Sequence, residues 1–334
     1  MDVGLYLDLR NPPDWRRDWA SHYAASLELA SHADELGIGQ IWLSEHHFFE
    51  DGYLPQPLTF AAAVAARTRR ARIGTAVLLA ALRHSLLVAE ESAIVDILSG
   101  GRLDLGIGAG YRIPEFSAYG VSLSERYRLV EQSILEIRHW WLGGRMTPPP
   151  IQQPIPIWGG FFGPRGAKMA GRLNVGLLAA SDDLLAHYQS GLKDGGHDLS
   201  LARMRVNVEL VLSDDPERTW SELRPFVSYQ WTTYRKYMAE GTNRPTPRPV
   251  DPEPLRLPST DGSPPRFQVL TPDAAAEFIL TRYAGLPVEQ VYLWASIAGM
   301  PDHIVHHHVD LLCTRLGPLL RSNSAPALRG VNED

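Results

Sequence analysis

Cysteine is nearly absent from this sequence of 334 residues: Cys313 is the only one, so no disulfide can form within the chain. No run of 18 apolar residues occurs, so we expect no membrane-spanning helix. Basic residues are not in excess, because the formal net charge is −6, and this argues against nucleic-acid binding. Residues 1–5 lack the basic region and long apolar region that begin an export signal. We therefore expect a cytoplasmic, soluble protein.

Several familiar motifs are also missing. A Gly-x-Ser-x-Gly elbow and a Walker sequence do not occur, so nothing supports a serine hydrolase or a P-loop NTPase. Gly106 and Gly108 imitate the start of a dinucleotide fingerprint, but Tyr111 stands where the third glycine is required. We interpret these two glycines as allowing a flat ring to lie close to the backbone.

What is present is a regular alternation of short apolar runs with stretches of helical periodicity. Hydrophobic residues make up 44% of the chain, which is enough for a large core. Eight such alternations predict parallel βαβ units and hence an α/β fold, a single (β/α)8 TIM barrel spanning 1–334. The predicted strands cover residues 3–7, 40–43, 71–79, 102–107, 155–158, 175–179, 205–212 and 288–295.

One segment interrupts this alternation. Residues 241–266, which follow the seventh predicted strand and a long predicted helix at 216–239, are dense in proline. Such a segment cannot continue a helix or a central strand. We predict that it is a lid over the mouth of the barrel or a flexible insertion, and an inert insertion is the alternative.

The working residues of an α/β barrel lie at the carboxyl ends of its strands, and Glu45, His46 and His47 end the second predicted strand. An imidazole titrates near neutral pH and can act as a general base. One histidine of the pair could instead be a buried core residue. A metal site formed by Glu45, His47 and His84 is a further alternative, although no His-x-His ends the first strand, where Asp8 stands alone.

Two other polar features follow from the sequence. The glycine-rich turn at 159–166 precedes a predicted helix and contains Arg165, so its backbone N–H groups and guanidinium could bind an anion. Histidines 303 and 306–308 lie on a predicted helix near the C-terminus, and we predict that they form a solvated face.

Taken together, these runs resemble the bacterial luciferase-like monooxygenases over nearly the whole chain. The resemblance lies in residues 42–48 (Trp-Leu-Ser-Glu-His-His-Phe), 72–77, 82–91, 98–108 (beginning Leu-Ser-Gly-Gly-Arg), 156–160, 167–170, 293–294 and 298–301.

The resemblance implies a monooxygenase that uses reduced FMN from a separate NAD(P)H:flavin reductase. Oxygen and flavin form a 4a-hydroperoxide, which inserts one oxygen atom of O2 into a small, lipophilic organic substrate; a homodimer is also implied. His46 falls on the family's catalytic base, supported by Glu45 and His47, and Ala76–Val77 on its non-proline cis peptide. The implied flavin contacts are Ala76, Val77, Gly108, Ala109, Tyr111, Gly160, Phe161, Phe162 and Arg165, and the implied substrate pocket contains Phe48, His84 and Trp294.

The sequence also departs from the family pattern. Ala109 stands where bacterial luciferase has an arginine that contacts the flavin phosphate, and aromatic residues replace polar ones at positions 161 and 162. Phosphate binding would then depend on backbone amides, Arg165, and Arg126 or Arg128. Two alternatives therefore stay open: a deazaflavin-dependent oxidoreductase of the same superfamily and a non-catalytic flavin-binding relative.

Overall fold

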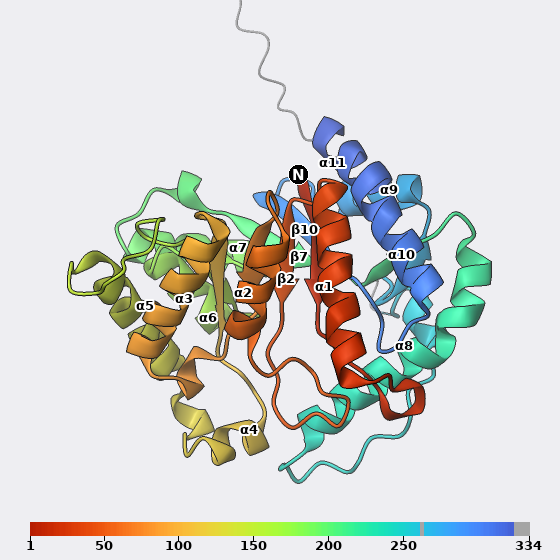
Figure 1. Cartoon of the computed structure of the whole chain (residues 1–334), viewed down its shortest axis with the longest axis horizontal. Coiled ribbons are helices and arrows are strands. Elements are labelled where there is room, and N and C mark those ends of the chain that lie inside the picture. The colour runs from red at the N-terminus through yellow and green to blue at the C-terminus, as the bar shows by residue number, and fades with distance from the viewer. Residues whose placement is uncertain (261–263, 324–334) are drawn as a thin grey trace, which may run out of the picture.

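The computed structural model describes residues 1–260 and 264–323. Eight parallel strands close into a barrel in the order β1-β10-β7-β6-β5-β4-β3-β2, and helices surround it (Figure 1). This confirms the predicted (β/α)8 TIM barrel. The barrel strands are β1 (Asp2–Leu7), β2 (Gln40–Leu43), β3 (Arg72–Thr75), β4 (Leu103–Gly108), β5 (Ile157–Gly160), β6 (Gly176–Leu177), β7 (Met204–Asn207) and β10 (Val288–Trp294).

The helices pack against the outer side of the strands, which is why most strand residues are buried and apolar. They are α1 (Trp19–Glu35), α2 (Pro57–Arg67), α3 (Ser85–Ser99), α4 (Ile113–Ala118), α5 (Arg126–Leu142), α6 (Pro164–Arg172), α7 (Asp182–Asp194), α8 (Pro216–Ala239), α9 (Pro272–Arg282), α10 (Asp302–Leu311) and α11 (Gly317–Asn323). The carboxyl ends of the strands face the side of the molecule that carries α4, at the bottom of Figure 1.

The seventh predicted strand is wrong in one respect, because it is two strands. Only β7 belongs to the barrel, whereas β8 (Leu210–Leu212) forms a separate parallel pair with β9 (Gln268–Leu270). The chain changes partner at Val208 and Glu209. The Val208 N–H donates to the Tyr292 carbonyl on β10, and the Glu209 carbonyl accepts from Gln268. Glu209 therefore lies at the carboxyl end of the barrel and not within a strand.

The proline-rich segment lies against α8. The Val250 N–H donates to Thr232 Oγ1 at 2.8 Å, Ser228 Oγ donates to the Val250 carbonyl at 2.6 Å, and Glu253 pairs with Arg224 at 2.8 Å. Residues 261–263 of the predicted lid lie outside the described part of the chain. Apart from a short 3-10 helix at Glu253–Arg256, the described part of the segment is irregular and is held by these contacts to α8.

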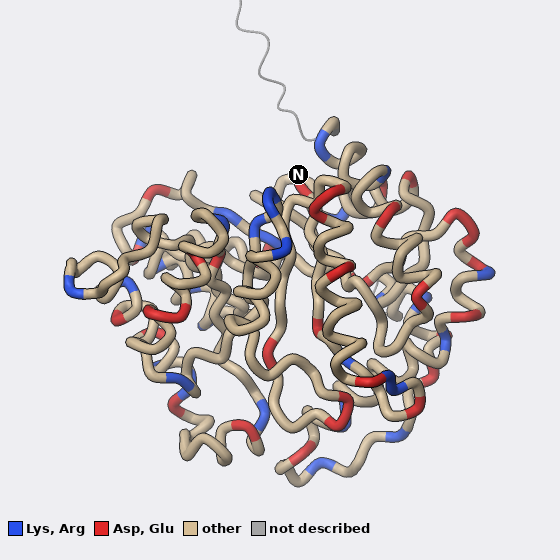
Figure 2. Tube along the Cα trace, in the orientation of Figure 1, with Lys and Arg blue, Asp and Glu red and all other residues tan. Residues whose placement is uncertain are grey.

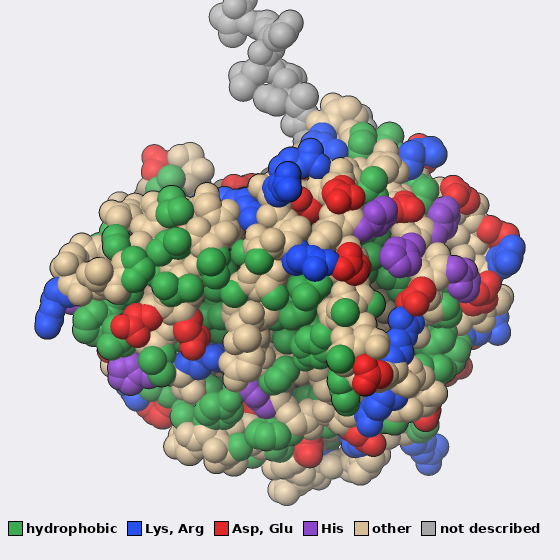
Figure 3. Space-filling model, viewed as in Figure 1, with side chains coloured by type: hydrophobic (Ala, Val, Ile, Leu, Met, Phe, Trp, Pro, Cys, Tyr) green, Lys and Arg blue, Asp and Glu red, His purple; other side chains and the backbone are tan. Residues whose placement is uncertain are grey.

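The histidine-rich helix corrects a second prediction. His303, His306 and His307 are exposed on α10, where histidines gather at the upper right of Figure 3, but His308 is buried. Its Nδ1 accepts from the Leu212 N–H at 2.9 Å and its Nε2 donates to the Trp294 carbonyl at 3.0 Å. Burial lowers the pKa of His308 to about 4, so the imidazole is neutral and ties α10 to β8 and β10.

Charged residues of both signs are interspersed along the chain (Figure 2). In the described ranges, no helix has both the length and the apolar character that crossing a membrane requires.

Candidate active site

A cavity of about 590 Å³ opens at the carboxyl ends of the barrel strands. Each of the eight strands, or the loop that follows it, contributes to its lining, and α8 closes one side with Gln230, Trp231, Tyr234 and Met238. Its size is in the range of cofactor and small-molecule sites.

His46 projects into this cavity and is held on three sides. Its ring stacks on Phe49 at a centroid distance of 4.6 Å and meets the edge of Tyr53 at 4.7 Å. Its Nδ1 lies 3.0 Å from Glu115 Oε1, and its Nε2 lies 3.4 Å from the Tyr111 hydroxyl. Since a carboxylate only accepts, Nδ1 carries the proton and Nε2 is left with a lone pair toward the cavity.

Glu115 on α4 is the partner that orients His46, and the sequence did not reveal it. Its side chain is fully buried and also accepts from the His47 N–H at 2.9 Å and from Arg112 at 3.1 Å. Burial opposes ionisation, but the hydrogen bond from His46, with the His47 N–H and the Arg112 charge, outweighs it and lowers the pKa of Glu115. Glu115 therefore remains a carboxylate at neutral pH.

Arg112 was also missed, and it anchors the same network. Its guanidinium is buried, pairs with Glu240 at the end of α8 at 2.5 Å, and lies over the rings of Phe49 and Tyr237 at 4.7 and 4.6 Å. An Arg followed three residues later by a Glu, just after a glycine run at a strand end, is the signal that could have revealed the pair.

Glu45 and His47 form a second buried pair beside His46. The His47 Nε2 lies 2.9 Å from Glu45 Oε1, and Glu45 also accepts from the Leu79 N–H and from Arg83, each at 2.8 Å. Glu45 lines the cavity, whereas His47 does not. This arrangement fits the alternative in which one histidine of the pair is a core residue.

A chain of tyrosine hydroxyls lies beside His46, whose ring is 4.7 Å from that of Tyr53 and 6.5 Å from that of Tyr234. Tyr234 and Tyr53 hydroxyls lie 2.8 Å apart, those of Tyr53 and Tyr6 lie 3.4 Å apart, and the Tyr6 hydroxyl donates to the Ala76 carbonyl at 2.8 Å. The Ala76–Val77 peptide is cis, as the resemblance implied. The backbone beside it is tightly packed, because a Cβ at Gly108 or Gly160 would stand only 2.2 or 2.4 Å from a methyl group of Val77.

The glycine-rich turn after β5 forms the outer rim of the cavity. Phe161 is buried beneath the turn, where Gly159 and Gly166 leave room for its ring, and Phe162 is 83% exposed. No side chain caps α6, whose N-cap residue Gly163 lines the cavity. The first N–H groups of α6 are therefore available to an anion.

Two arginines lie on the Tyr127 ring at this rim, with guanidinium carbons 5.1 Å (Arg126) and 4.9 Å (Arg165) from its centroid. Arg126 lines the large cavity, whereas Arg165 lies in a separate depression beside Lys168 and Arg172. Arg128 is exposed and pairs with Glu125 at 2.6 Å. Arg126 is thus the arginine that the structure brings to the cavity.

The structure brings most of the predicted site residues together. Phe48 and His84 are exceptions: Phe48 is 64% exposed in a left-handed backbone conformation (φ 61°), and His84 is an exposed N-cap residue of α3. Both lie outside the cavity, contrary to the prediction. His47 and Arg165 are also absent from its lining. The predicted residues that line it are Glu45, His46, Ala76, Val77, Gly108, Ala109, Tyr111, Gly160, Phe161, Phe162 and Trp294.

The metal alternative finds no support. Within 1–260 and 264–323, no three His, Cys, Asp or Glu side chains are grouped so that they could hold a metal ion.

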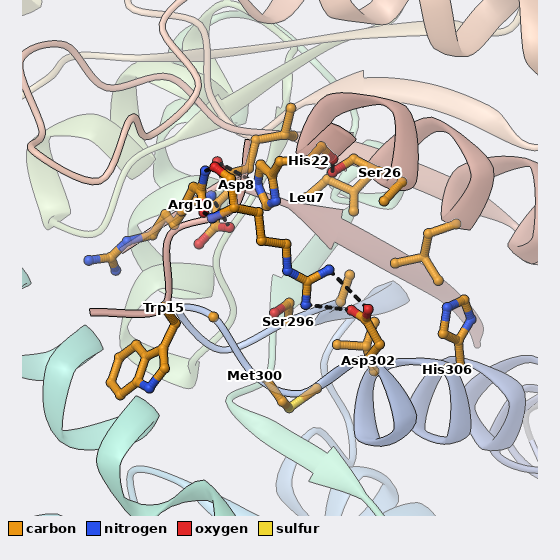
Figure 4. A pocket seen from close by; sticks show the side chains of 18 of the residues that line it. Leu7, Asp8, Arg10, Trp15, His22, Ser26, Ser296, Met300, Asp302 and His306 are labelled. Carbon is orange, nitrogen blue, oxygen red and sulfur yellow. Dashed lines mark hydrogen bonds and ion pairs between the residues drawn. The ribbon is translucent and has the colours of Figure 1, made fainter. Parts of the chain in front are cut away.

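A second cavity lies between the end of β1, α1 and α10, and Figure 4 shows it from close by. Its volume is about 110 Å³, and Arg17 pairs with Asp302 on its wall at 2.7 Å. Burial raises the pKa of Asp8, which lines this cavity, to about 7. The cavity at the barrel mouth is the candidate active site because all eight barrel strands or the loops after them line it and because His46 projects into it.

Comparison with known proteins points to one family. A sequence model of the family described as luciferase-like monooxygenase matches residues 1–289. The F420-dependent glucose-6-phosphate dehydrogenase of Amycolatopsis mediterranei (strain U-32) is 28% identical over 240 residues, 63% of this chain and 72% of that protein. The 4-hydroxyprotoasukamycin monooxygenase of Streptomyces nodosus subsp. asukaensis is 28% identical over 227 residues, 59% and 61% of the two chains.

Among solved structures, one similar fold is the oxygenating constituent of 3,6-diketocamphane monooxygenase from Pseudomonas putida, in complex with FMN. It covers 96% of this chain and 98% of its own with a TM-score of 0.74, at 18% sequence identity. At this identity the likeness concerns the fold alone.

Proposed function

Because the chain belongs to the luciferase-like monooxygenase family, we propose that it is a two-component monooxygenase that accepts reduced FMN from a separate reductase. It would transfer one oxygen atom of O2 to a small organic substrate. The observation that carries this proposal is His46, which offers Nε2 to the cavity while the buried Glu115 carboxylate holds its Nδ1.

The residues of the cavity fit a flavin mononucleotide. The tightly packed backbone of Gly108 and Gly160 against Val77 leaves a smooth wall for a flat ring. At the rim, the uncapped N–H groups of α6 and the Arg126 guanidinium suit a phosphate. Ala109 adds no charge there, so phosphate binding would depend on the backbone and on Arg126. When bound, reduced flavin supplies the electrons that activate O2.

His46 would act as the base that takes up and returns a proton at Nε2. Glu115 fixes the tautomer and stabilises the imidazolium that forms, as an orienting carboxylate does in other His–carboxylate pairs. Tyr111, whose hydroxyl is 3.4 Å from Nε2, can pass or hold that proton. Aromatic residues on the remaining sides limit the access of water, which would otherwise compete for the activated oxygen.

The deazaflavin alternative is favoured by one observation. The similar Amycolatopsis dehydrogenase is named for the deazaflavin F420, so family membership alone does not choose the cofactor. In that case the same His46–Glu115 pair would exchange a proton with an alcohol or carbonyl substrate during hydride transfer.

A cofactor titration separates the two functions. The protein is titrated with reduced and oxidised FMN and, separately, with the deazaflavin, and the bound fraction is measured after desalting. Reduced FMN that binds and is reoxidised by O2 with incorporation of oxygen into an organic probe supports the monooxygenase. Tight binding of deazaflavin without binding of FMN would exclude it.

We also propose that the protein is a homodimer. Leu87, Ile94 and Leu98 are 56%, 45% and 54% exposed on α3, and apolar side chains gather over the same half of the molecule in Figure 3. Exposed apolar patches of this kind are typical of protein interfaces. Analytical ultracentrifugation of the wild type and of Ile94→Lys tests this: we expect a dimer that the substitution converts to a monomer.

A further inference from the structure

We propose that the side of the active-site cavity formed by β7, β10 and α8 binds a cationic nitrogen, so that the substrate is an organic amine. Glu209 would accept the ammonium group, and Trp231, Tyr234 and Trp294 would surround it. This inference rests on the proposed function for the reaction that follows binding, but not for the binding itself.

Glu209 is a carboxyl group in the cavity without a partner. It lies between β7 and β8 and lines the cavity, and no hydrogen bond or ion pair reaches its side chain from the described residues. Burial raises its pKa to about 7, and the charge of Arg266, which acts at a distance, offsets this only in part. A carboxyl group in this position is poorly stabilised when ionised, and a cationic ligand would supply the missing counter-charge.

Two further polar atoms on this side of the cavity are unpaired. Gln230 Oε1 on α8 and Trp294 Nε1 at the end of β10 are buried, and the described residues offer neither of them a hydrogen bond. Their side chains are only 4% and 5% exposed, and both residues line the cavity. Buried polar atoms usually have partners, so unpaired ones beside a cavity indicate a ligand. Gln230 Oε1 can accept from an ammonium N–H, whereas Trp294 Nε1 is a donor and would need an acceptor elsewhere on the substrate.

The rings on this side suit a cation. Trp231, Tyr234, Tyr292 and Trp294 line the cavity, and the Tyr234 and Trp294 centroids are 6.3 Å apart. Faces of tryptophan and tyrosine attract ammonium groups, and more strongly when water is excluded. Aromatic rings near an acceptor carboxyl group are a typical environment for amines.

The charges of the cavity are divided between its sides. Arg126 lies at the rim near β5, which suits an anion, whereas Glu209 follows β7. In the strand order of the barrel, β7 is four positions from β3, so Glu209 stands across the barrel from Val77, where the flat ring would lie. A substrate amine held at Glu209 would therefore occupy the cavity without competing for the phosphate site.

Two small probes test the inference directly. Benzylamine and its neutral analogue benzyl alcohol are titrated into the wild-type protein at pH 8, and binding is followed by tryptophan fluorescence and by saturation-transfer NMR. We expect benzylamine to bind about tenfold more tightly than the alcohol, because only the amine adds a charge-assisted hydrogen bond. Equal affinity for the two probes would overturn the inference without any variant.

Variants locate the binding. Glu209→Gln should reduce the affinity for benzylamine about tenfold, to that of benzyl alcohol, while benzyl alcohol binding is unchanged. Glu90→Gln, the same substitution at an exposed position of α3, is the matched control and should change neither affinity. Undiminished benzylamine binding by a folded Glu209→Gln protein would show that the amine binds elsewhere and would overturn the proposal.

FMN titration of the same samples separates this inference from the proposed function. FMN binding that is unaffected by Glu209→Gln, together with loss of amine preference, supports both. Amine binding at Glu209 without any FMN binding would leave the inference intact and remove the proposed function. FMN binding without any preference for the amine would leave the proposed function intact and overturn the inference.

Discussion

Two sides of the same cavity carry carboxyl groups that differ in their hydrogen-bond donors and in the direction of their pKa shifts. On the side of β2 and α4, Glu45 and Glu115 each accept three or more hydrogen bonds, and the pKa of Glu115 is lowered. On the side of β7 and α8, none of the described residues donates a hydrogen bond to Glu209, and burial raises its pKa to about 7. Unpaired buried polar atoms occur on both sides, for example Glu115 Oε2 on the first and Gln230 Oε1 on the second. The difference lies in the carboxyl groups: those of the first side are held by donors around His46, whereas Glu209 could be satisfied by a ligand.

The difference has an energetic meaning. Removing one member of a paired, buried network leaves the others unsatisfied and is costly. Removing a half-buried carboxyl group that has no partner among the described residues relieves part of a desolvation cost instead. Replacing a carboxyl group by an amide should therefore lower stability on the side of Glu115 and raise it on the side of Glu209. The first substitution should affect the reaction itself, and the second should affect substrate binding.

The largest effect is expected for the catalytic base. His46→Ala should lower turnover by about 10² to 10⁴-fold, because proton transfer at Nε2 is lost. FMN affinity, measured by fluorescence quenching, should change by less than about threefold, since His46 makes no contact with the phosphate rim. Turnover is measured by mass spectrometry as incorporation of one oxygen atom into amine and neutral lipophilic probes. Equal losses in turnover and FMN affinity would indicate a structural role for His46.

The next largest effect is expected for Glu115, the carboxylate that orients His46. Glu115→Gln should lower the free energy of unfolding by about 3 kcal/mol, because the buried Arg112 loses a charged partner. Urea denaturation measures this, with Glu90→Gln as the control, for which we expect no change. A stability loss no larger than that of the control would mean that the network around Arg112 is not stabilised by Glu115.

On the opposite side, Glu209→Gln should raise the free energy of unfolding by about 1–2 kcal/mol at pH 8. The folded-state pKa of about 7 lies above the ordinary value of 4.5, so the folded protein binds the proton more tightly. The contribution of Glu209 to the free energy of unfolding is thus greatest below pH 4.5 and falls as pH rises toward 7. The difference in the free energy of unfolding between Glu209→Gln and the wild type should grow over this pH interval. A variant less stable than the wild type at pH 8 would contradict the description of Glu209 as unpaired.

The sequence predicted the barrel and the Glu45-His46-His47 run because both depend on local patterns. Glu115 escaped prediction because it is 69 residues from His46 and lies on a short helix without clear periodicity. Glu209 was not predicted as a site residue because residues 205–212 resemble a single strand. The acidic residue in the middle of this segment was a signal that the strand is interrupted there. Phe48 and His84 were placed in the pocket by resemblance to the family, but in this chain both are exposed outside the cavity, Phe48 in a left-handed backbone conformation and His84 as the N-cap residue of α3.

The smallest effect concerns His308, which supports the side of β10 from behind Trp294. Its pKa of about 4 lies below the ordinary value of 6.5, so its contribution to stability is present above pH 6.5 and is lost as pH falls toward 4. The contribution of Glu209 to stability changes with pH in the opposite direction over much of the same pH interval. His308→Gln should cost about 1 kcal/mol at pH 7, since an amide can replace only part of the two hydrogen bonds, and this cost should shrink by pH 5. A cost that is equal at pH 7 and pH 5, measured by urea denaturation, would mean that folding does not lower the pKa of His308.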